Sequence, residues 1–310
     1  MPEVESALLS RVRGGILNVA PEMDVALMKR IGIFYHPLKE AACMLAKEVT
    51  TFLRERRLAV WLCSAWDWER ALPQIGGTDL ILSVGGDGTI LRAAQAVMPH
   101  PIPIAGINLG RLGFMSELSV SETIEKLPLL IEGNGHLDER CVLEAELDAS
   151  GKAPRHFYAL NDVVVARGAT ARLINVNATV DGTSMATLRA DGAVVATATG
   201  CTGYALGAGG PILHPHSPDK VLAPLLPHLS FSYPVVLPAS SVCQLTLEDP
   251  TPGIVSIDGH ISIDMACGDA VSVKSSTSTV RFLRVHDTSF YGSLEQRLKG
   301  KQPGNARSES

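Results

Sequence analysis

One ten-residue stretch decides the fold: residues 80–89 read Leu-Ile-Leu-Ser-Val-Gly-Gly-Asp-Gly-Thr. Its first five residues are apolar except for one serine, which predicts a short strand. Glycines then interrupt the run, and residues 89–97 follow with helical spacing. The stretch therefore predicts a strand, a tight glycine-rich turn and the start of a helix.

The turn itself, residues 85–88, is a candidate site for a phosphorylated ligand. Glycines let the backbone approach a ligand closely, and the N-terminus of the following helix points free N–H groups at an anion. The carboxylate of Asp87 repels phosphate, so it fits a residue that binds a metal or accepts a proton from an attacking hydroxyl. The alternative is a plain strand-to-helix turn in which Asp87 caps the helix.

The segments around this stretch alternate between strands and helices. Apolar runs over residues 31–34, 58–63 and 102–107 predict further strands, and residues 40–56 have the apolar spacing of a helix. This alternation is typical of a parallel, doubly wound sheet, which binds ligands at the carboxyl ends of its strands. We expect residues 29–135 to form an α/β nucleotide-phosphate domain, rejoined by a helical segment within residues 286–299.

Residues 136–285 have a different pattern, with short apolar–polar alternations separated by turns. Predicted strands include residues 142–147, 174–180, 243–247, 254–257, 261–264, 270–273 and 280–285. This spacing predicts an all-β sandwich, which we expect to bind the substrate. Residues 1–28 form an N-terminal extension with no clear strand signal, and residues 300–310 form a polar, flexible tail.

A second glycine-rich segment, residues 191–211, lies inside the expected sandwich. Small residues and hydroxyls dominate it, a composition that suits backbone packed closely against a flat ligand. Ordered loops of this length are usually functional, which favours a binding loop. A glycine-rich loop that merely packs on the sandwich is the alternative.

Smaller features carry less information. Asn161-Asp162 either contacts a ligand or kinks a strand, and Asp258-Gly259 by itself predicts a hairpin turn. His214 and His216 have no third metal ligand nearby in the sequence, which favours a solvated loop. Cys201 is expected to be a small buried thiol. The chain contains no Walker A loop, complete dinucleotide fingerprint or protein-kinase motif set.

Composition narrows the class of protein. With 27 Lys and Arg against 32 Asp and Glu, the net charge is −5, so no basic excess indicates a nucleic acid or an anionic membrane as partner. Aromatic residues make up only 5%, too few for a base-stacking surface.

The six cysteines form no C-x-x-C pair, which favours a reducing compartment. Two long uncharged stretches, residues 192–218 and 221–247, hold too many Gly, Thr or Pro residues for lipid-facing helices. We expect a soluble, cytoplasmic protein.

Taken together, these segments resemble the NAD kinase family over residues 31–298. The matching motifs occur in the family's order: residues 85–89, 106–114, 161–164, 191–211 and 258–259. The first is shared with diacylglycerol, sphingosine and phosphofructo-kinases. The segments 106–114 and 191–211 are far more specific to the family.

The resemblance implies an activity and partners. The family transfers a phosphoryl group from ATP, or in some members from polyphosphate, to the 2′-hydroxyl of the adenosine ribose of NAD. It requires a divalent cation such as Mg²⁺, for which we assign no ligand residue. Its members usually form homodimers or homotetramers, so we expect a homo-oligomer that binds small-molecule nucleotides.

The resemblance also implies site residues by position. Asp87 corresponds to the general base. The residues expected to bind ATP phosphates are Gly85, Gly86, Gly88 and Thr89. Those expected to bind the acceptor are Phe114, Asn161, Asp162, Asp191, Thr202, Gly203, Tyr204, Gly207 and Asp258. Within that set, Asp191 and Tyr204 are expected towards the nicotinamide end, partly across a subunit interface.

Departures from the family pattern cluster among these acceptor residues. Asp162 replaces the usual glutamate, Gly203 an alanine and Gly207 a serine, and His260 follows Asp-Gly where glutamine is frequent. Such losses enlarge the pocket and remove hydrogen bonds worth about 0.5–1.5 kcal/mol each. Two alternatives to an NAD kinase therefore stay open: a kinase of the same fold acting on another nucleoside or nucleotide hydroxyl, and a non-catalytic nucleotide sensor. The intact Asp87 argues against the sensor.

Overall fold

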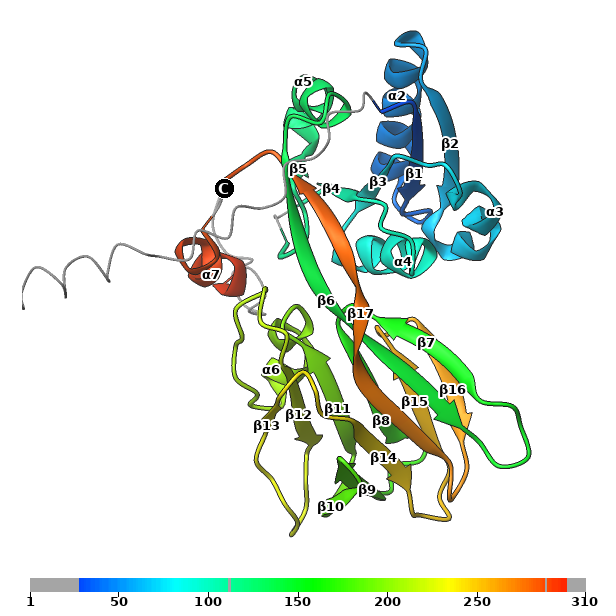
Figure 1. The fold of residues 1–310 in the computed structure, drawn as a ribbon, viewed down its shortest axis with the longest axis vertical. Coiled ribbons are helices and arrows are strands. Elements are labelled where there is room, and N and C mark those ends of the chain that lie inside the picture. Colours follow the sequence, from blue (N-terminus) through cyan, green and yellow to red (C-terminus); the bar gives the residue numbers. More distant parts are fainter. Residues whose placement is uncertain (1–27, 111–112, 288, 300–310) are drawn as a thin grey trace, which may run out of the picture.

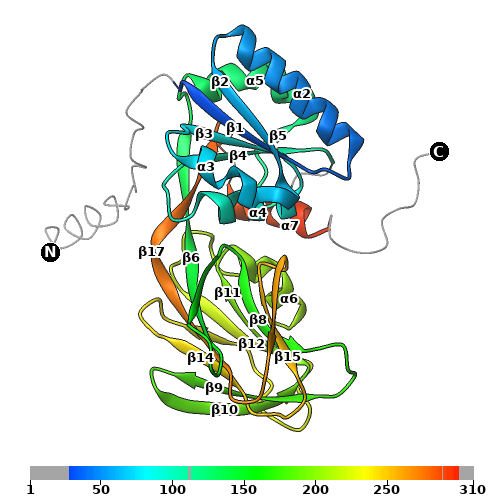
Figure 2. The ribbon, with the colours of Figure 1, turned by 90° about the vertical axis from the view of Figure 1, so that its right-hand side faces the viewer.

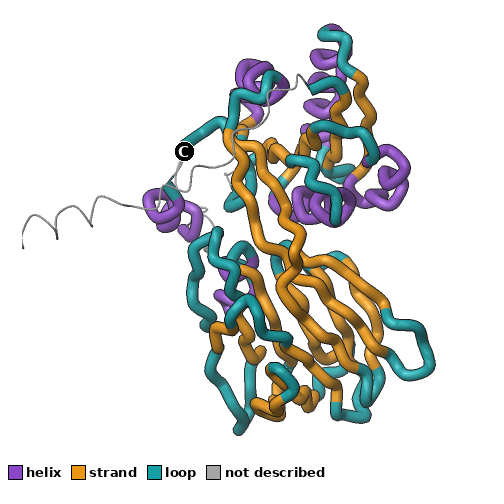
Figure 3. The backbone as a smooth tube through the Cα atoms, viewed as in Figure 1, coloured by secondary structure: helices purple, strands orange, loops and turns teal. Residues whose placement is uncertain are grey.

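The computed structural model describes residues 28–110, 113–287 and 289–299. Nearly all of the predicted extension at residues 1–28 and the whole predicted tail at residues 300–310 lie outside the described residues. Figure 1 shows an upper half in which helices surround a sheet and a lower half made mainly of strands, and Figure 3 shows the same division by element type. The predicted fold class, an α/β portion followed by a β-sandwich, is confirmed.

Parallel strands form the centre of the upper half, in the order β4-β3-β1-β2. They are β1 (Arg30–Tyr35), β2 (Ala59–Ser64), β3 (Leu80–Gly85) and β4 (Ile104–Asn108), with a short β5 (Leu118–Ser119) beside β4. The chain adds β2 on one side of β1 and β3 on the other. The winding direction therefore reverses between β1 and β3, and ligands of such sheets bind beyond the carboxyl ends of the strands at this point.

Helices cover both faces of this sheet. One face packs against α2 (Glu40–Glu55) and α5 (Val120–Ile131), and the other against η1 (Ala65–Ala71), α3 (Leu72–Ile75) and α4 (Asp87–Val97). Every residue of β3 and β4 is buried, which explains why residues 80–84 show no apolar–polar alternation.

The lower half is a sandwich of two antiparallel layers around one apolar core. One layer has the order β13-β12-β11-β8-β15-β16. Its strands are β8 (Asp162–Arg167), β11 (Gly192–Thr197), β12 (Lys220–Leu225), β13 (Val235–Leu237), β15 (Gly253–Ile257) and β16 (Ile261–Met265). The other layer consists of β6 (His136–Asp148), β7 (Arg155–Ala159), β9 (Ile174–Val180), β10 (Thr183–Ala190), β14 (Cys243–Leu247) and β17 (Ala270–Arg284).

The two halves share a sheet, which the sequence did not indicate. Strands β6 and β17 pair from Ala270↔Asp148 to Arg284↔His136, and Phe282 of β17 pairs with Ile104 of β4. One layer of the sandwich and the upper sheet are therefore a single eleven-stranded sheet. Figures 1 and 2 show β6 and β17 running from the sandwich into the α/β half. The predicted domain boundaries at 135/136 and 285/286 fall at the upper ends of these two strands and stay a prediction.

Strand β17 corrects the prediction of two separate strands at residues 270–273 and 280–285. Residues 274–279 read Lys-Ser-Ser-Thr-Ser-Thr and carry no apolar signal. They nevertheless lie within one strand. The pairing of this strand with β6 shifts register between Ser275 and Thr279. The hydroxyl of Ser276 donates to Glu144 on β6 at 2.7 Å. Side-chain bonds and an irregular ladder thus replace apolar packing where the strand passes between the two halves.

The segment 191–211 also differs from the predicted long loop. Its first part is β11, and short helices η2 (Gly200–Thr202) and α6 (Tyr204–Gly207) follow. All of β11 is buried at the centre of its layer, so its small residues are needed for packing. A side chain at Gly192 would collide with the carbonyl oxygen of Val165 on β8.

The uncharged stretches at 192–218 and 221–247 contain β11 and β12, two neighbouring strands in which every residue is buried. Their burial explains the missing charges. Within the described residues, none of the helices has the length and apolar character needed to cross a membrane.

The last helix, α7 (Phe290–Lys299), follows β17. It lies between the α/β half and α6 in both views of Figures 1 and 2. The ring of Phe290 is 5.4 Å from that of His214, in the loop after α6. The guanidinium of Arg297 donates to the carbonyl oxygen of Phe114 in the α/β half at 3.0 Å. The helix therefore contacts both halves.

We expect Phe282→Ala to destabilise the whole chain, because this fully buried ring lies where β17 joins β4. Large-to-small changes at such aromatic positions cost about 3–5 kcal/mol. Urea unfolding followed by circular dichroism measures the loss. Met44→Ala on α2 is the control, since Met44 is 65% exposed and its loss should change stability by less than about 0.5 kcal/mol. Equal stability of the two variants would contradict the importance of this junction.

Candidate active site

The glycine-rich turn lies at the carboxyl end of β3, where the winding direction of the sheet reverses. Gly86 is the residue that precedes α4, and Asp87 is the first residue of this helix. Gly85 must lack a side chain, because a Cβ there would collide with the hydroxyl of Thr89. A Cβ on Gly86 meets nothing within 4 Å, so open space borders the backbone at the helix N-terminus.

The carboxylate of Asp87 does not cap its helix, so the capping role that the plain-turn alternative gave it is wrong. It reaches across to the segment after β4 instead. There the backbone N–H of Phe114 donates to Oδ2 at 3.2 Å, and the hydroxyl of Ser116 donates to Oδ1 at 3.4 Å. A side chain at Gly113 would collide with this carboxylate. Asp87 is thus held in place by a loop that leaves room for it.

A second carboxylate cluster lies at the edge of the sandwich. Asp258 lies in the β15–β16 turn with φ of 50°, so the predicted hairpin turn is present. Its buried carboxylate accepts the backbone N–H groups of Leu160, Asn161 and Asp162 at 2.9, 2.7 and 3.1 Å. The turn residue therefore also fixes the conformation of the chain that enters β8.

The two buried carboxyls of this cluster titrate unusually. Burial raises the pKa of Asp162 to about 7, and the negative charge of Asp258 adds to that effect. Burial also raises the pKa of Asp258 to about 6, against the lowering effect of its three backbone hydrogen bonds. At neutral pH Asp162 is thus partly a neutral acid, able to donate a hydrogen bond.

Three buried polar atoms near these residues have no hydrogen-bond partner among the described residues: Thr89 Oγ1, Asn161 Oδ1 and His260 Nε2. Buried polar atoms are normally satisfied by protein, water or ligand, so these three atoms are candidates for contact with a ligand or an ordered water. His260 was noted in the sequence only as a departure from glutamine. Its side chain is partly buried, and its Nδ1 lies 3.2 Å from the carbonyl oxygen of Asp258. This position beside the Asp258 turn makes His260 a candidate ligand contact.

The loop after β11 packs on the same cluster. A side chain at Gly200 would collide with the carbonyl oxygen of Asn161. The hydroxyl of Thr202 donates to the carbonyl oxygen of Thr199 at 3.2 Å. Cys201 is fully buried, and burial raises its pKa. The expectation of a small buried thiol thus agrees with its surroundings.

The remaining predicted acceptor residues are spread more widely. Phe114 is 7% exposed beside Asp87, whereas Tyr204 is 54% exposed on α6, with Gly203 and Gly207 at its ends. Asp191 pairs with Arg167 at 2.8 Å, at the opposite end of β11 from Thr202. At about 3.3 Å per residue, six strand residues separate those ends by roughly 20 Å. One copy of the chain therefore does not bring Asp191 into this cluster.

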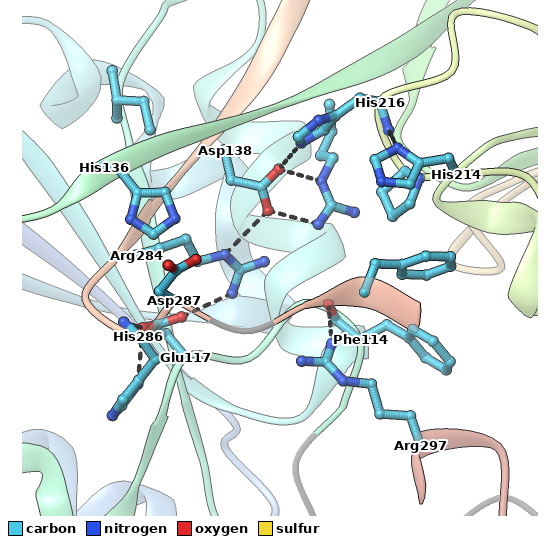
Figure 4. A pocket seen from close by; sticks show the side chains of 14 residues that line it. Phe114, Glu117, His136, Asp138, His214, His216, Arg284, His286, Asp287 and Arg297 are labelled. Atoms are coloured by element: carbon cyan, nitrogen blue, oxygen red, sulfur yellow. Dashed lines mark hydrogen bonds and ion pairs between the residues drawn. The ribbon is translucent and has the colours of Figure 1, made fainter. Parts of the chain in front are cut away.

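A network of charges connects the two halves, and no spacing in the sequence indicates it. Asp138 of β6 pairs with the guanidiniums of Arg140 and Arg284, and Figure 4 shows Asp138 near Arg284 and His216. The distances from Asp138 are 2.6 Å to Arg140, 3.2 Å to Arg284 and 2.9 Å to His216. Burial would raise the pKa of Asp138, but hydrogen bonds and charges from the two arginines outweigh it and hold it below its usual range.

This network reaches both candidate clusters. Arg284 donates to the carbonyl oxygens of Met115 and Ser116 at 2.9 and 3.1 Å, in the loop that holds Asp87. Arg140 contacts the hydroxyl of Thr199 at 3.4 Å, in the loop after β11. One buried carboxylate thus fixes the two loops relative to each other.

The network lines a cavity of about 330 Å³ between the halves. Phe114, Arg140, Arg284 and Arg297 are among its lining residues, as are the rings of His214 and His216. His214 and His216 are exposed in the loop after α6, in agreement with the predicted solvated loop, and His216 also pairs with Asp138. Within the described residues, no three His, Cys, Asp or Glu side chains form a group able to hold a metal ion.

Comparisons with known proteins match nearly the whole chain. Residues 31–135 match the family model described as ATP-NAD kinase N-terminal domain, and residues 160–285 match the ATP-NAD kinase C-terminal domain. The NAD kinase of Dehalococcoides mccartyi (strain BAV1) is 44% identical over 276 residues, covering 88% of this chain and 97% of its own. That of Chloroflexus aurantiacus (strain J-10-fl) is 35% identical over 274 residues, covering 88% and 99%.

Solved structures agree. Yeast NADH kinase complexed with NADH aligns with a TM-score of 0.79 and 25% identity over 91% of each chain. An NAD kinase from Archaeoglobus fulgidus in complex with ATP aligns with a TM-score of 0.70 and 26% identity, over 88% of this chain and 100% of the other. Family models and relatives thus cover both halves of the fold, and the chain belongs to the ATP-NAD kinase family.

Proposed function

We propose that this chain is an NAD kinase that transfers the γ-phosphoryl group of ATP to the 2′-hydroxyl of the adenosine ribose of NAD, producing NADP and ADP. The observation that carries the proposal is the carboxylate of Asp87, held by Phe114 N–H and Ser116 at the start of α4. Family membership supplies the identity of the two nucleotides.

In this proposal Asp87 is the general base. The 2′-oxygen forms a bond to the γ-phosphorus, the bond from that phosphorus to the bridging oxygen of ADP breaks, and the hydroxyl proton passes to Asp87. Gly85, Gly86, Gly88 and Thr89 border the phosphates, with the N-terminus of α4 directed at their negative charge. Phosphoryl transfer of this kind depends on positioning and charge neutralisation, not on a covalent nucleophile.

The acceptor would lie against the carboxylate cluster of the sandwich. Phe114, Asn161, Thr202 and Gly203 would hold the adenosine, and the unsatisfied Oδ1 of Asn161 supports this placement. Asp258 would lie near the reacting hydroxyl. Asp162, partly neutral near pH 7, would donate a hydrogen bond to a ribose oxygen.

The outer acceptor residues extend the proposal to a homo-oligomer. Asp191, Tyr204 and Gly207 would lie towards the nicotinamide end, and the position of Asp191 at the far end of β11 requires a second copy to bring it near a nucleotide. The β12–β13 connection carries exposed apolar side chains that suit such contact: Leu226, Leu229, Phe231 and Tyr233. We place the oligomer in the cytoplasm on the cysteine pattern described above.

A divalent cation completes the proposal. Mg²⁺ at phosphoryl-transfer sites is ordinarily held by one or two carboxylates together with phosphate oxygens and waters. Because Asp87 is assigned to the proton and the described residues hold no group of three metal-binding side chains, Mg²⁺ would arrive on the ATP, held mainly by phosphate oxygens and waters. When bound, this cation neutralises charge on the donor phosphates.

ADP release by the purified protein with ATP and Mg²⁺ tests the function, using NAD, NADH and a panel of nucleosides as acceptors. We expect NAD-dependent turnover with NADP as product. Turnover with a nucleoside but not with NAD would favour the same-fold kinase, and absence of turnover with every acceptor would favour the sensor.

Asp87→Asn should reduce turnover by at least about 100-fold, because general-base catalysis contributes about 10²–10⁴-fold. Binding of NAD, measured by calorimetry, should stay within about twofold of wild type. The exposed Glu125→Gln on α5 is the control and should keep full activity. Unchanged turnover in the Asp87 variant would rule out this residue as the base.

Asp162→Asn should stabilise the protein at high pH. The folded pKa of Asp162, about 7, lies above its ordinary value of 3.8, so the wild type loses stability as the pH rises from about 4 to 7. Asparagine removes this loss. We expect the advantage of the variant in urea unfolding to grow by on the order of 3 kcal/mol between pH 5 and pH 8. The exposed Asp264→Asn should show no such growth, and a parallel pH dependence of both variants would contradict the assignment.

Gly207→Ser should tighten the acceptor site. A Cβ at Gly207 meets nothing within 4 Å, so the family's usual serine fits without displacement. One regained hydrogen bond of about 0.5–1.5 kcal/mol lowers KM for NAD by roughly 2- to 10-fold. Steady-state kinetics measure it. Gly76→Ser, at an equally open position after α3, is the control. An unchanged KM for NAD in the Gly207 variant would place this residue outside the acceptor site.

A further inference from the structure

Arg297 reaches the site from the last described helix. Its guanidinium donates to the carbonyl oxygen of Phe114 at 3.0 Å and lies 5.7 Å from the centre of the Phe114 ring. The N–H of the same Phe114 donates to Asp87. Phe114 thus links the guanidinium of Arg297 to the carboxylate of Asp87, the first residue of α4. Figure 4 shows Arg297 and Phe114 together at the cavity wall.

Three guanidiniums line this cavity, and two of them are neutralised. Arg140 pairs with Asp138, and Arg284 pairs with Asp138 and, at 3.3 Å, with Glu117. Arg297 makes no ion pair with any residue in the ranges 28–110, 113–287 and 289–299. Burial lowers its pKa, the charges of Arg284 and Arg140 lower it further, and Asp87 and Glu117 raise it. A half-buried cation with two cationic neighbours is best stabilised by an anion in the cavity.

The cavity is separate from most of the proposed acceptor contacts. Phe114 lines it, but Asn161, Asp162, Asp258 and Thr202 do not, and neither do residues 85–89, so Phe114 is where the cavity meets the Asp87 turn. Its volume of about 330 Å³ is large enough for a small ligand, and its lining also includes the carboxylates of Glu117, Asp138 and Asp287. Arginine also presents its N–H donors in a planar fork that matches the oxygens of a phosphate.

We propose that Arg297 binds the terminal phosphate of the phosphoryl donor where this cavity meets the Asp87 turn at Phe114, and stabilises the charge on the transferred phosphoryl group. This inference rests on the proposed function and deepens it. Arg297 stays protonated throughout and donates hydrogen bonds only. The bond from the 2′-oxygen to phosphorus forms, the phosphoric anhydride bond breaks, and the proton goes to Asp87. ATP and inorganic polyphosphate share this anhydride chemistry, so both are tested as donors.

Steady-state kinetics of Arg297→Gln and Arg297→Lys test the proposal. We expect Arg297→Gln to lower kcat by about 10³-fold, as removal of a phosphoryl-stabilising arginine does, and to raise KM for the donor while KM for NAD is unchanged. Lysine restores the charge but not the fork, so Arg297→Lys should recover part of kcat. The donor whose KM rises, ATP or polyphosphate, identifies the occupant.

Arg281→Gln is the matched control. Arg281 of β17 pairs with Glu139 of β6 at 2.8 Å and is partly exposed, so its loss should leave kcat within about twofold. Thermal unfolding of every variant confirms that the folded protein is measured. A raised KM for NAD with an unchanged KM for the donor would mean that Arg297 acts through Phe114 on the acceptor, which overturns the proposal.

Calorimetry with inorganic tripolyphosphate gives a second measurement that needs no acceptor. We expect wild type and Arg281→Gln to bind it equally, and Arg297→Gln to bind it at least 10-fold more weakly. Equal binding by all three proteins would overturn the proposal. This arm also separates the two hypotheses, because wild type that binds tripolyphosphate through Arg297 but does not phosphorylate NAD would refute the proposed function alone.

Discussion

The pairing of β6 with β17 is the constraint on which the rest of the structure depends. This antiparallel ladder runs from within the sandwich to the edge of the parallel sheet, where Phe282 pairs with Ile104. Because backbone hydrogen bonds continue through the junction, the two halves form one mechanical unit instead of two bodies on a linker. The Asp87 turn and the loop after β11 belong to different halves, so this ladder sets their separation.

The charges at the upper end of the ladder refine that geometry. Removing two guanidiniums and a carboxylate from water is costly, and such groups add little net stability compared with apolar packing. Their bonds are directional, however, and each ends on a loop of the site: Arg284 on residues 115 and 116, Arg140 on Thr199. We infer that Asp138 contributes mainly by selecting one arrangement of the two halves.

Local sequence signals were sufficient to predict much of the fold. The strand and turn at residues 80–89 were predictable because a fully buried strand must be apolar and a sharp turn must be glycine-rich. The same burial was misleading at β11, where small residues looked like a loop, and the polar stretch within β17 hid one continuous strand. Asp258 was predictable as a turn, but its three backbone partners lie 96–98 positions away.

Asp138, Arg140, Arg284 and Arg297 were not predictable as a group. Each is an ordinary charged residue within a strand or helix, and no spacing in the sequence relates them. Their partnership arises only when β6, β17 and α7 meet, and the resemblance to a family drew attention to its motifs instead.

The position of α7 has a consequence for the order of folding. Its contact between Arg297 and Phe114 closes 183 residues of chain, and the contact of Arg284 with Met115 closes 169. Loops of this length close late, because chain entropy opposes them until both halves have formed their own local contacts. The parallel sheet and the sandwich core can therefore consolidate first. The chemical centre between them is assembled last and depends on a completed fold on both sides.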